Sequence, residues 1–457
     1  MIVSRDWAGK RYAVLGLARS GAATVSALLA GGARVVAWDS DPAKREALAP
    51  LPFRGGAGGG ALPQDAALEE PPHPNPSPEG EGLTIAPLDD LSGFDALVVS
   101  PGVPLNTHPL AASARAAGVP VIGDIELFAQ ARHDLPPHKV VGITGTNGKS
   151  TTTALVHHIL KTAGVPTLMG GNIGLPILGQ EPLPAGGVYV LELSSYQIDL
   201  TRSLDCDVAV LLNITPDHLD RYDGFAGYAA SKARLFAMQS AGHVAVVGTG
   251  DEASANIAQG LAGRTDDLVT IASDPIDQSR WPALQGPHNA QNARAAIAVA
   301  RALGIAEDAI EAGLASYASL PHRMQQVATR NGVAFVNDSK ATNPESTAPA
   351  LGAFPRVHWI VGGKRKGDDL DACAQHLGHV VAAYTIGEAA PLFFDLLKDK
   401  VPVVEQSGTL EAAVAHAAAA ARPGDTVLLS PACASFDQFR DYEARGDAFR
   451  AAVEALA

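Results

Sequence analysis

The chain has 457 residues, and its 34 Lys and Arg against 48 Asp and Glu give a net charge of −14. This length suggests about three domains, and 47% apolar residues suffice for several buried cores, which excludes a wholly disordered protein. An acidic surface is not attracted to a polyanion, so we expect no nucleic-acid partner and no membrane partner. Any anionic ligand must therefore be bound by a local arrangement of residues, because the chain as a whole is acidic.

The three cysteines form no CxxC pair, which argues against a disulfide framework and against a structural zinc site. The start, MIVSRDWAGKRYAVLGL, lacks a long apolar stretch before a small-residue cleavage site. No apolar run reaches the roughly eighteen residues of a membrane span. We therefore expect a cytoplasmic protein, and we expect it to act as a monomer.

Short runs rich in Val and Ile alternate with Ala-rich stretches, a pattern typical of βαβ units. Many of the runs are continuously apolar, as strands covered on both faces should be. The sequence therefore predicts an α/β fold with mainly parallel sheets. The predicted strands are 12–17, 34–38, 96–100, 139–143, 188–193, 208–213, 244–247, 333–337, 357–361, 380–386 and 426–430.

Prolines mark two breaks in this alternation, in ARHDLPPHK (131–139) and in SYASLPHR (316–323). These breaks predict domains at 1–130, 131–320 and 321–457. Residues 55–82 differ in composition, with five Gly within 55–60 and five Pro within 71–78. Such a segment cannot form a core, so we expect a flexible surface insertion within the first domain.

The strongest local motif is KVVGITGTNGKSTTTALVHHIL (139–160), a strand, a Gly-rich turn and a helix that opens with Lys-Ser-Thr. Glycines let backbone N–H groups crowd a phosphate, Lys149 supplies a cation, and a hydroxyl can reach Mg²⁺. The spacing departs from GxxxxGK[ST], because Ile143 stands where the first Gly belongs. An ordinary turn with a chance GKS is the alternative, but the flanking strand and helix favour nucleotide binding.

The N-terminal segment YAVLGLARSGAATVSALLAGGARVVAWDSD resembles a dinucleotide-binding βαβ unit, with Asp39 ending the second strand. Gly16 and Gly21 do not complete GxGxxG, so another diphosphate ligand is favoured over NAD. The segment SPGVP (100–104) also ends a strand, where open α/β sheets bind ligands. We expect it to line the same crevice.

Acidic and imidazole groups follow two further strands: Glu192 in LELSSYQID, and Asp217, His218 and Asp220 in LLNITPDHLDRY. Because parallel strands end at one edge of a sheet, we expect these groups near the phosphate loop, where they can bind Mg²⁺. Each group alone would more often be part of a solvated loop. Lys232 lies near the start of the next helix, and by position alone it would be a surface charge.

Several later motifs carry polar groups at the ends of strands or helices. Asn289 and Asn292 in GPHNAQN face one side of a helix start, where they could read a purine or cap the helix. The segments LPHRMQQV, FVNDSKATNPEST, VGGKRKGDDL and LSPACASFDQF hold small, hydroxyl and charged residues. Each segment could be only a polar turn, but together they are suited to bind a small anionic substrate.

The ordered set of motifs closely resembles the ATP-dependent Mur ligases of bacterial cell-wall synthesis. The set is GITGTNGKST, GGNIG, LELSSYQ, NITPDHLDRY, GPHNAQNA, LPHR, NDSKATN, GGKRKG and SPACASFDQF. It spans nearly the whole chain except the 55–82 insertion. The phosphate loop and HNxxN are shared with folylpolyglutamate ligases, whereas NDSKATN and SPACASFDQF look specific to the members that add D-glutamate.

The resemblance implies a Rossmann-like N-terminal domain for a UDP sugar, a central P-loop-type ATPase domain and a Rossmann-like C-terminal domain for an amino acid. The implied reaction adds D-glutamate to UDP-N-acetylmuramoyl-L-alanine through an acyl phosphate, with ADP and phosphate as products, in the peptidoglycan synthesis that supports cell shape and division. Mg²⁺, as two ions, would be the cofactor, and Lys232 matches a lysine that is carbamylated in the family.

The resemblance also assigns roles to residues, carried over position by position. The implied ATP-binding residues are Gly145, Thr146, Asn147, Gly148, Lys149, Ser150, Thr151, Asn289, Asn292, Arg323, Asp338 and Lys340. The implied catalytic residues are Lys149, His218, Lys232 and His322, and the implied metal ligands are Ser150, Glu192, His218 and Lys232. The implied substrate residues are Leu17, Ala18, Arg19, Asp39, Ser40, Gly102, Asn172, Ser194 and Gln197 for the nucleotide sugar, and Thr342, Lys366, Ser435, Phe436 and Tyr442 for D-glutamate.

Three alternatives remain at this point. A related ligase could add a different amino acid, which a panel of amino acids would reveal. A nicotinamide-dependent oxidoreductase is suggested only by the first βαβ unit. A non-catalytic nucleotide sensor could keep the ATP loop, although the acid, His and Lys positions of the family are nearly all present.

Overall fold

The computed structural model describes residues 1–48, 82–217, 221–263, 267–272, 274, 276–365 and 367–456. The predicted insertion lies almost wholly outside the described residues, and His218 and Lys366 lie outside them as well. The described chain separates into two compact units. The first comprises Met1–Lys139, Met169–Cys206 and Asp217–Ser240, and the second comprises Val140–Leu168, Asp207–Pro216 and Ala241–Ala457.

The first sheet has the strand order β3-β2-β1-β4-β5, and each of its described pairs is parallel. Strand β1 lies at the centre, and four of its five residues are buried. The strands are β1 (Arg11–Leu15), β2 (Arg34–Trp38), β3 (Leu83–Ile85), β4 (Ala96–Val99) and β5 (Val121–Ile122). The accompanying helices are α1 (Arg19–Ala30), α2 (Pro42–Leu48), α3 (Pro109–Ala116) and α4 (Asp124–Ala131).

The second sheet has the order β11-β10-β9-β6-β8-β7. Strands β8 and β9 are buried along their whole length, as expected for strands covered on both faces. Helix α5 packs against α9 and α10. The strands are β6 (His138–Thr144), β7 (Thr167–Gly171), β8 (Gly187–Glu192), β9 (Val208–Leu211), β10 (Val244–Gly248) and β11 (Leu268–Ile271). The helices are α5 (Lys149–Thr162), α6 (Ser195–Asp199), α7 (Gly224–Ala237), α8 (Glu252–Leu261), α9 (Pro287–Ala302) and α10 (Glu307–Ser316).

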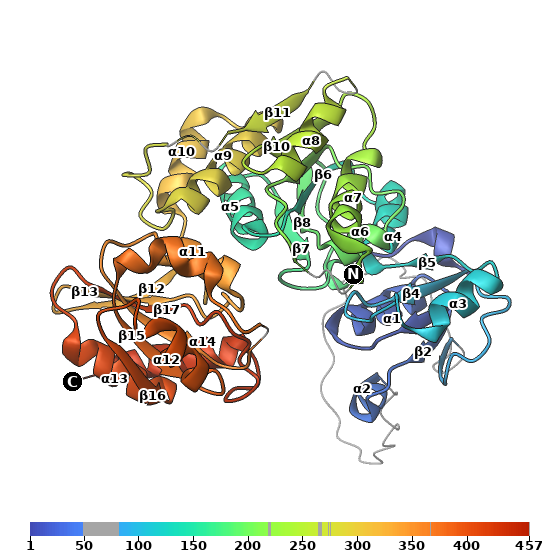
Figure 1. Ribbon diagram of the computed structural model, residues 1–457. Coiled ribbons are helices and arrows are strands. Elements are labelled where there is room, and N and C mark those ends of the chain that lie inside the picture. Colours follow the sequence, from blue (N-terminus) through green and yellow to red (C-terminus); the bar gives the residue numbers. More distant parts are fainter. Residues whose placement is uncertain are drawn as a thin grey trace, which may run out of the picture. The chain divides into compact units, whose positions relative to one another are not determined.

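The third sheet has the order β12-β13-β17-β14-β15-β16, and only β12 pairs antiparallel to its neighbour. Its strands are β12 (Gln325–Arg330), β13 (Val333–Asn337), β14 (Val357–Gly362), β15 (Val380–Ile386), β16 (Val404–Gly408) and β17 (Thr426–Leu429). The helices around it are α11 (Pro344–Leu351), α12 (Ala390–Leu397), α13 (Leu410–Ala420) and α14 (Tyr442–Glu454) (Figure 1). Short 3₁₀ helices elsewhere are Arg5–Trp7, Arg132–Asp134, Ile177–Gly179 and Asp371–His379.

The two faces of the third sheet bury separate hydrophobic clusters. Along β14, Trp359 and Val361 join the cluster with α11 and α12, while Ile360 joins the cluster with α13 and α14. This alternation follows from the two-residue period of a strand. The helices thus cover the two faces of the sheet, and the loops at the carboxyl ends of the strands are where doubly wound sheets bind ligands.

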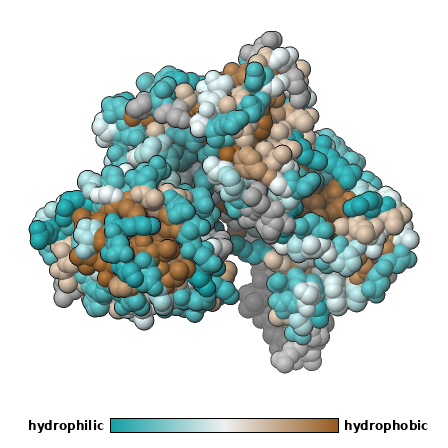
Figure 2. Space-filling view, in the orientation of Figure 1, coloured by the Kyte–Doolittle hydropathy of each residue, from teal (hydrophilic) through white to brown (hydrophobic). Residues whose placement is uncertain are grey.

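All eleven predicted strands are confirmed, each end within two residues, and the ranges 34–38, 333–337 and 380–386 match without error. Six further strands were not predicted: β3, β5, β7, β11, β12 and β16. The predicted domain boundaries stay a prediction. Figure 2 shows hydrophobic residues gathered in the region where Figure 1 draws α12, α13 and β16. Among the described helices, none is long and apolar enough to cross a membrane.

Candidate functional site

The phosphate loop joins β6 to α5 in the second unit, and its shape depends on glycine. Gly148 is the N-cap of α5 with φ 85°, a left-handed conformation that favours glycine. A Cβ atom on Gly148 would lie 2.3 Å from Asn292 Oδ1, so even alanine would collide there. The loop can therefore bring backbone N–H groups close to a ligand, and no side chain caps the helix end.

Lys149 and Asn213 hold the loop from two sides. Lys149 Nζ donates to the carbonyl oxygens of Thr146 and Gly145 at 2.7 and 3.0 Å, which keeps its cation at the loop. Asn213, just beyond β9, accepts from Asn147 N at 2.9 Å and donates back to Asn147 O at 3.2 Å. The sequence analysis did not single out Asn213, although NITPD contains it.

A cavity of about 130 Å³ in the second unit brings together predicted ATP residues that lie far apart in the sequence. Its lining includes eight of the twelve: Asn147, Gly148, Thr151, Asn289, Asn292, Arg323, Asp338 and Lys340. Two basic side chains and one carboxyl group therefore face one space with several amides. The convergence of segments near 150, 290, 323 and 340 is the arrangement that a nucleotide pocket requires.

Asn292 connects α9 to α5, because its Oδ1 accepts from Thr152 Oγ1 at 3.2 Å. Its Nδ2 donates to Asn289 Oδ1 at 3.1 Å, and Asn289 in turn donates to Gln285 O. The N-cap of α9 is Gly286, and no side chain caps that helix. The capping alternative is thus wrong, whereas reading of a purine by these amides stays a prediction.

Burial changes the ionisation of two further groups that line this cavity. It raises the pKa of Asp338 to about 7, even though the carboxylate accepts from Ser430 Oγ at 2.8 Å and from Met324 N at 3.1 Å. Burial also lowers the pKa of His288 to about 4, so this imidazole is neutral. Asp338 therefore changes charge near neutral pH, within the candidate nucleotide pocket.

His322 has a defined orientation at the start of the C-terminal sheet. Its Nδ1 accepts from Asn337 Nδ2 at 3.1 Å, and that amide also donates to Gly446 O. Burial lowers the pKa of His322 despite the nearby Asp447, so the ring is neutral at pH 7. Because Nδ1 accepts, Nε2 carries the proton and can donate to an anion.

Among the described residues predicted for the amino acid, Thr342 follows β13, Ser435 and Phe436 follow β17, and Tyr442 begins α14. Ser435 is buried, whereas Phe436 is 68% exposed. The Tyr442 ring lies 3.7 Å from Lys340 Nζ and meets the His322 ring edge-on at 6.2 Å. These contacts bring residues predicted for ATP, for the reaction centre and for the amino acid into one cluster.

The first unit holds a crevice of about 780 Å³ at the ends of β1, β2 and β4. Ala18, Asp39, Ser40 and Gly102 line it, as a nucleotide-sugar site predicts, whereas Leu17 and Arg19 do not. Asp39 Oδ2 accepts from Leu17 N at 2.7 Å. Burial alone would raise the pKa of Asp39, but hydrogen bonds from backbone N–H groups and the nearby Lys44 lower it.

Glu192 is buried at the end of β8, and Asn172 holds it. Asn172 donates from its backbone N to Glu192 O and from Nδ2 to Glu192 Oε1, each at 2.8 Å. Ser194 and Gln197 form a capping box at the start of α6, which occupies part of their hydrogen-bonding capacity. Lys232, 1% exposed on α7, is not the surface charge that its position alone suggests.

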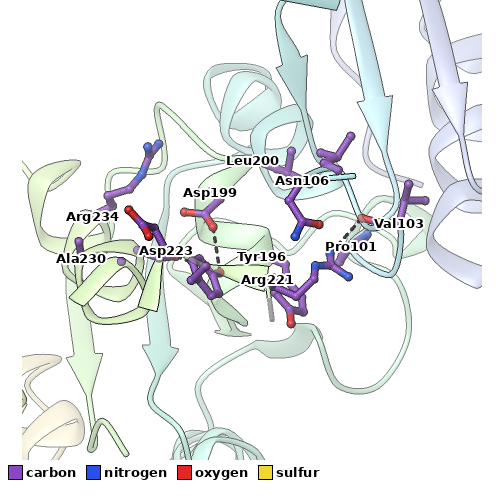
Figure 3. Close-up of a pocket in the computed structure, with 14 residues that line it drawn as sticks. Pro101, Val103, Asn106, Tyr196, Asp199, Leu200, Arg221, Asp223, Ala230 and Arg234 are labelled. Carbon is purple, nitrogen blue, oxygen red and sulfur yellow. Dashed lines mark hydrogen bonds between the residues drawn. The ribbon is translucent and has the colours of Figure 1, made fainter. Parts of the chain in front are cut away.

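A second pocket of the first unit, of about 510 Å³, is lined by residues of the SPGVP segment and by α6 and α7 (Figure 3). Arg221 lies 4.3 Å from the centre of the Tyr196 ring and donates to Val103 O at 3.0 Å. Tyr222 stacks on Tyr196 and donates to Asp199 at 2.9 Å. Arg221 thereby joins the strand-end segment 100–104 to the segment after Glu192.

Known families match the chain over these same segments. A model of the Mur ligase middle domain matches residues 143–279, and a model of the Mur ligase, glutamate ligase domain, matches residues 322–433. The chain belongs to the Mur ligase family. This Mur ligase is 63% identical to the UDP-N-acetylmuramoylalanine–D-glutamate ligase of Novosphingobium aromaticivorans, over 100% of this chain and 97% of that protein. It is 61% identical to the enzyme of the same name from Sphingopyxis alaskensis, over the full length of both.

Solved structures agree on the fold of this Mur ligase. The UDP-N-acetylmuramate-alanine ligase of Thermotoga maritima aligns with a TM-score of 0.58 at 15% identity, over 98% of this chain and 99% of that one. A pseudomurein peptide ligase type C from Methanothermus fervidus aligns with a TM-score of 0.55 at 18% identity, over 98% and 100%. At such identities the likeness concerns the three-domain architecture alone.

Four residues of this Mur ligase that the sequence analysis did not single out contact the predicted site: Asn213, His288, Arg221 and Arg445. For His288 a signal existed, because it stands directly before Asn289 in GPHNAQN. For Arg445 no local signal existed, since an arginine within a helix is usually a surface residue. His218 and Lys366 lie outside the described residues, so their predicted roles stay predictions.

Proposed function

We propose that this Mur ligase adds D-glutamate to UDP-N-acetylmuramoyl-L-alanine with the consumption of ATP, which forms ADP and phosphate in peptidoglycan precursor synthesis. One observation carries the proposal: two relatives with this activity in their names are more than 60% identical over the whole chain. The crevice at Asp39, the cavity at Gly148 and the loop at Ser435 offer places for the three substrates. We place the reaction in the cytoplasm and expect a single chain to perform it.

The residues at the phosphate loop fit ATP. Gly148 leaves room where a Cβ would collide, the helix end lacks a side-chain cap, and Lys149 brings a cation. Arg323 adds a second cation in contact with Ser150. Four negative charges of a nucleotide triphosphate can thus be met within a chain whose net charge is −14.

The donors proposed for Mg²⁺ are oxygen atoms, which suit a hard cation. Ser150 offers a hydroxyl, Glu192 a carboxylate, and Lys232 would offer one as a carbamate. In the described part of the chain no three His, Cys, Asp or Glu side chains gather into a metal site, and His218 lies outside that part. When bound, Mg²⁺ would neutralise the negative charge that builds up on the phosphate oxygens during phosphoryl transfer.

A carboxylate is a poor electrophile, so one of its oxygens must become a leaving group before an amine can attack. We propose that the L-alanyl carboxylate attacks the γ-phosphorus and displaces ADP, which gives an acyl phosphate, with Lys149 and Arg323 holding the phosphates in line. The free amine of D-glutamate then attacks the acyl carbon, and the tetrahedral intermediate expels phosphate, which takes up the proton that the nitrogen loses. The Nε2–H of His322 is suited to donate to the oxyanion.

Phosphate release from Mg²⁺-ATP tests the proposal directly. The purified chain is assayed with UDP-N-acetylmuramoyl-L-alanine and with D-glutamate, L-glutamate or another amino acid in turn. Release that needs both the nucleotide sugar and D-glutamate supports the proposal, and release with another amino acid would change the substrate. Transfer of ¹⁸O from the substrate carboxylate to phosphate tests the acyl phosphate, and its absence would refute that intermediate.

A further inference from the structure

Arg445 is a buried cation within α14, with 1% of its surface exposed. Its guanidinium donates four hydrogen bonds, and every acceptor is a neutral oxygen. Nε donates to Ser339 Oγ at 3.0 Å and Nη2 to Ser339 O at 2.9 Å. Nη2 also donates to Cys433 O at 3.0 Å, and Nη1 donates to Ala434 O at 3.1 Å.

These bonds connect two loops that leave the same edge of the third sheet. β13 and β17 pair in parallel, so the loops after Asn337 and after Leu429 emerge side by side. Ser339 lies between Asp338 and Lys340, and Ala434 directly precedes Ser435. One side chain therefore sets the spacing between loops that carry predicted ATP residues and predicted amino-acid residues.

Among the described residues no ion pair joins Arg445 to a carboxylate, although the charge of Asp437 acts on the guanidinium and favours its charged form. Burial lowers the pKa of Arg445 to about 10, so it remains charged at neutral pH. A buried charge without a direct ion pair is costly unless its surroundings compensate for it. Neighbouring carbonyl dipoles and the charge of Asp437 supply part of that compensation, and an anion bound at the adjacent loops would supply more.

We propose that Arg445 is a positioning residue for the incoming amino acid. It fixes the loops of Ser339 and Ser435 relative to each other, and its positive charge favours a ligand with two carboxylates over one with a single carboxylate. The inference rests on the proposed function, since it names what selects the dianionic amino acid within that reaction.

The test uses the full chain with Arg445→Lys and Arg445→Met, and Arg330→Lys as the matched control. Arg330, like Arg445, donates to backbone carbonyls, but its acceptors are Glu454 O at the C-terminal end of α14 and Leu456 O just beyond it. Steady-state phosphate release gives kcat and the KM for each substrate. D-Glutamine, which lacks the second carboxylate, is the probe for charge selectivity, and thermal unfolding is recorded for each variant.

We expect Arg445→Lys to raise the KM for D-glutamate by about tenfold and Arg445→Met by about a hundredfold, with the KM for ATP changed by less than about twofold. The preference for D-glutamate over D-glutamine should fall in Arg445→Met and should be partly retained in Arg445→Lys. Arg330→Lys should lower the unfolding temperature without a change in the KM for D-glutamate.

Unchanged KM and unchanged selectivity in Arg445→Lys, together with a lower unfolding temperature, would overturn the proposal and leave a purely structural arginine. If Arg445→Met does not fold, Arg445→Lys decides the matter. Failure of the proposed function looks different, because the wild-type chain would then release no phosphate in response to D-glutamate. In that case the inference falls with the function on which it rests.

Discussion

The guanidinium of Arg323 donates to the hydroxyl of Ser150 over 2.6 Å, although 173 positions separate the two residues. Ser150 is the second residue of α5, directly after Lys149, and Arg323 lies just before β12. The phosphate loop is therefore completed by a cation from a distant part of the chain. A ligand at this loop meets two basic side chains, of which only Lys149 belongs to the local motif.

Replacement of Arg323 by alanine should raise the KM for ATP by roughly ten- to a hundredfold, because a charged hydrogen bond contributes about 1.5–3 kcal/mol. The KM for D-glutamate should change little. Steady-state phosphate release at varied ATP measures this effect. Arg280→Ala is the control, since Arg280 is exposed and pairs with Glu311. An unchanged KM for ATP would remove Arg323 from the nucleotide site.

Gly148→Ala should abolish nucleotide binding, because the new Cβ would lie 2.3 Å from Asn292 Oδ1. Gly164, just beyond the other end of α5, also has a positive φ, of 75°, but open space around it. Both substitutions should destabilise the fold by about 1–2 kcal/mol through backbone strain. Calorimetric titration with ATP separates them: Gly164→Ala should bind normally, and normal binding by Gly148→Ala would contradict the expectation.

The strands that the sequence predicts are those with long buried apolar runs, such as β13 and β15. The strands that it misses lack this signature. β16 reads VEQSG and has no fully buried residue, and β12 is an edge strand with no fully buried residue. Pairing with a neighbour defines these strands, and a single sequence does not record that pairing.

The phosphate loop could be predicted because its glycines, lysine and hydroxyls stand within seven consecutive residues. Asn213 acts on the same loop from 66 positions away, and its role emerges only when β9 lies beside β6. Arg445 and Ser339 are 106 positions apart. Such contacts are set by the topology of the sheets, so local motifs do not indicate them.

The pocket of Figure 3 leads to a prediction about the nucleotide sugar. Arg221→Lys keeps the charge but loses the guanidinium contact with the Tyr196 ring and the bond to Val103 O. We expect the KM for UDP-N-acetylmuramoyl-L-alanine to rise several-fold, which corresponds to a loss of roughly 1 kcal/mol of binding free energy. The KM for ATP should stay unchanged. Arg115→Lys, an exposed position on α3, serves as the control. An equal rise in both KM values would indicate a general disturbance instead.

Lys232 offers a test of the proposed carbamate. Lys232→Met keeps most of the buried volume and should lower kcat by on the order of a hundredfold, since a metal ligand would be lost. Activity of the wild-type chain should fall when bicarbonate and CO₂ are removed and return when they are restored. Labelling with ¹³C-bicarbonate and NMR should show a carbamate signal that Lys232→Met lacks, whereas Lys161→Met, exposed on α5, should keep it. Identical signals in both variants would place the carbamate elsewhere.

A stability prediction concerns Asp425, which lies 2% exposed at the start of β17. Burial alone would raise its pKa, but bonds from Arg356 Nε at 2.6 Å and His358 Nε2 at 3.1 Å, and from a backbone N–H, lower the pKa to about 2. Because the folded pKa lies below the unfolded one, the carboxylate stabilises the fold above pH 4 and this contribution disappears as the pH falls toward 2.

Asp425→Asn should therefore lower the free energy of unfolding by about 2–3 kcal/mol at pH 7. The charge-dependent part of the difference from the wild type should shrink below pH 4 and disappear only below pH 2, where the Asp425 side chain is protonated and uncharged. Urea unfolding across this pH range measures the difference in the free energy of unfolding. Asp395 is an exposed partner of Lys398, so Asp395→Asn is a control whose difference from the wild type should not depend on pH. A difference that stays constant with pH would show that Asp425 stabilises the fold through packing and neutral hydrogen bonds, with no contribution from its charge.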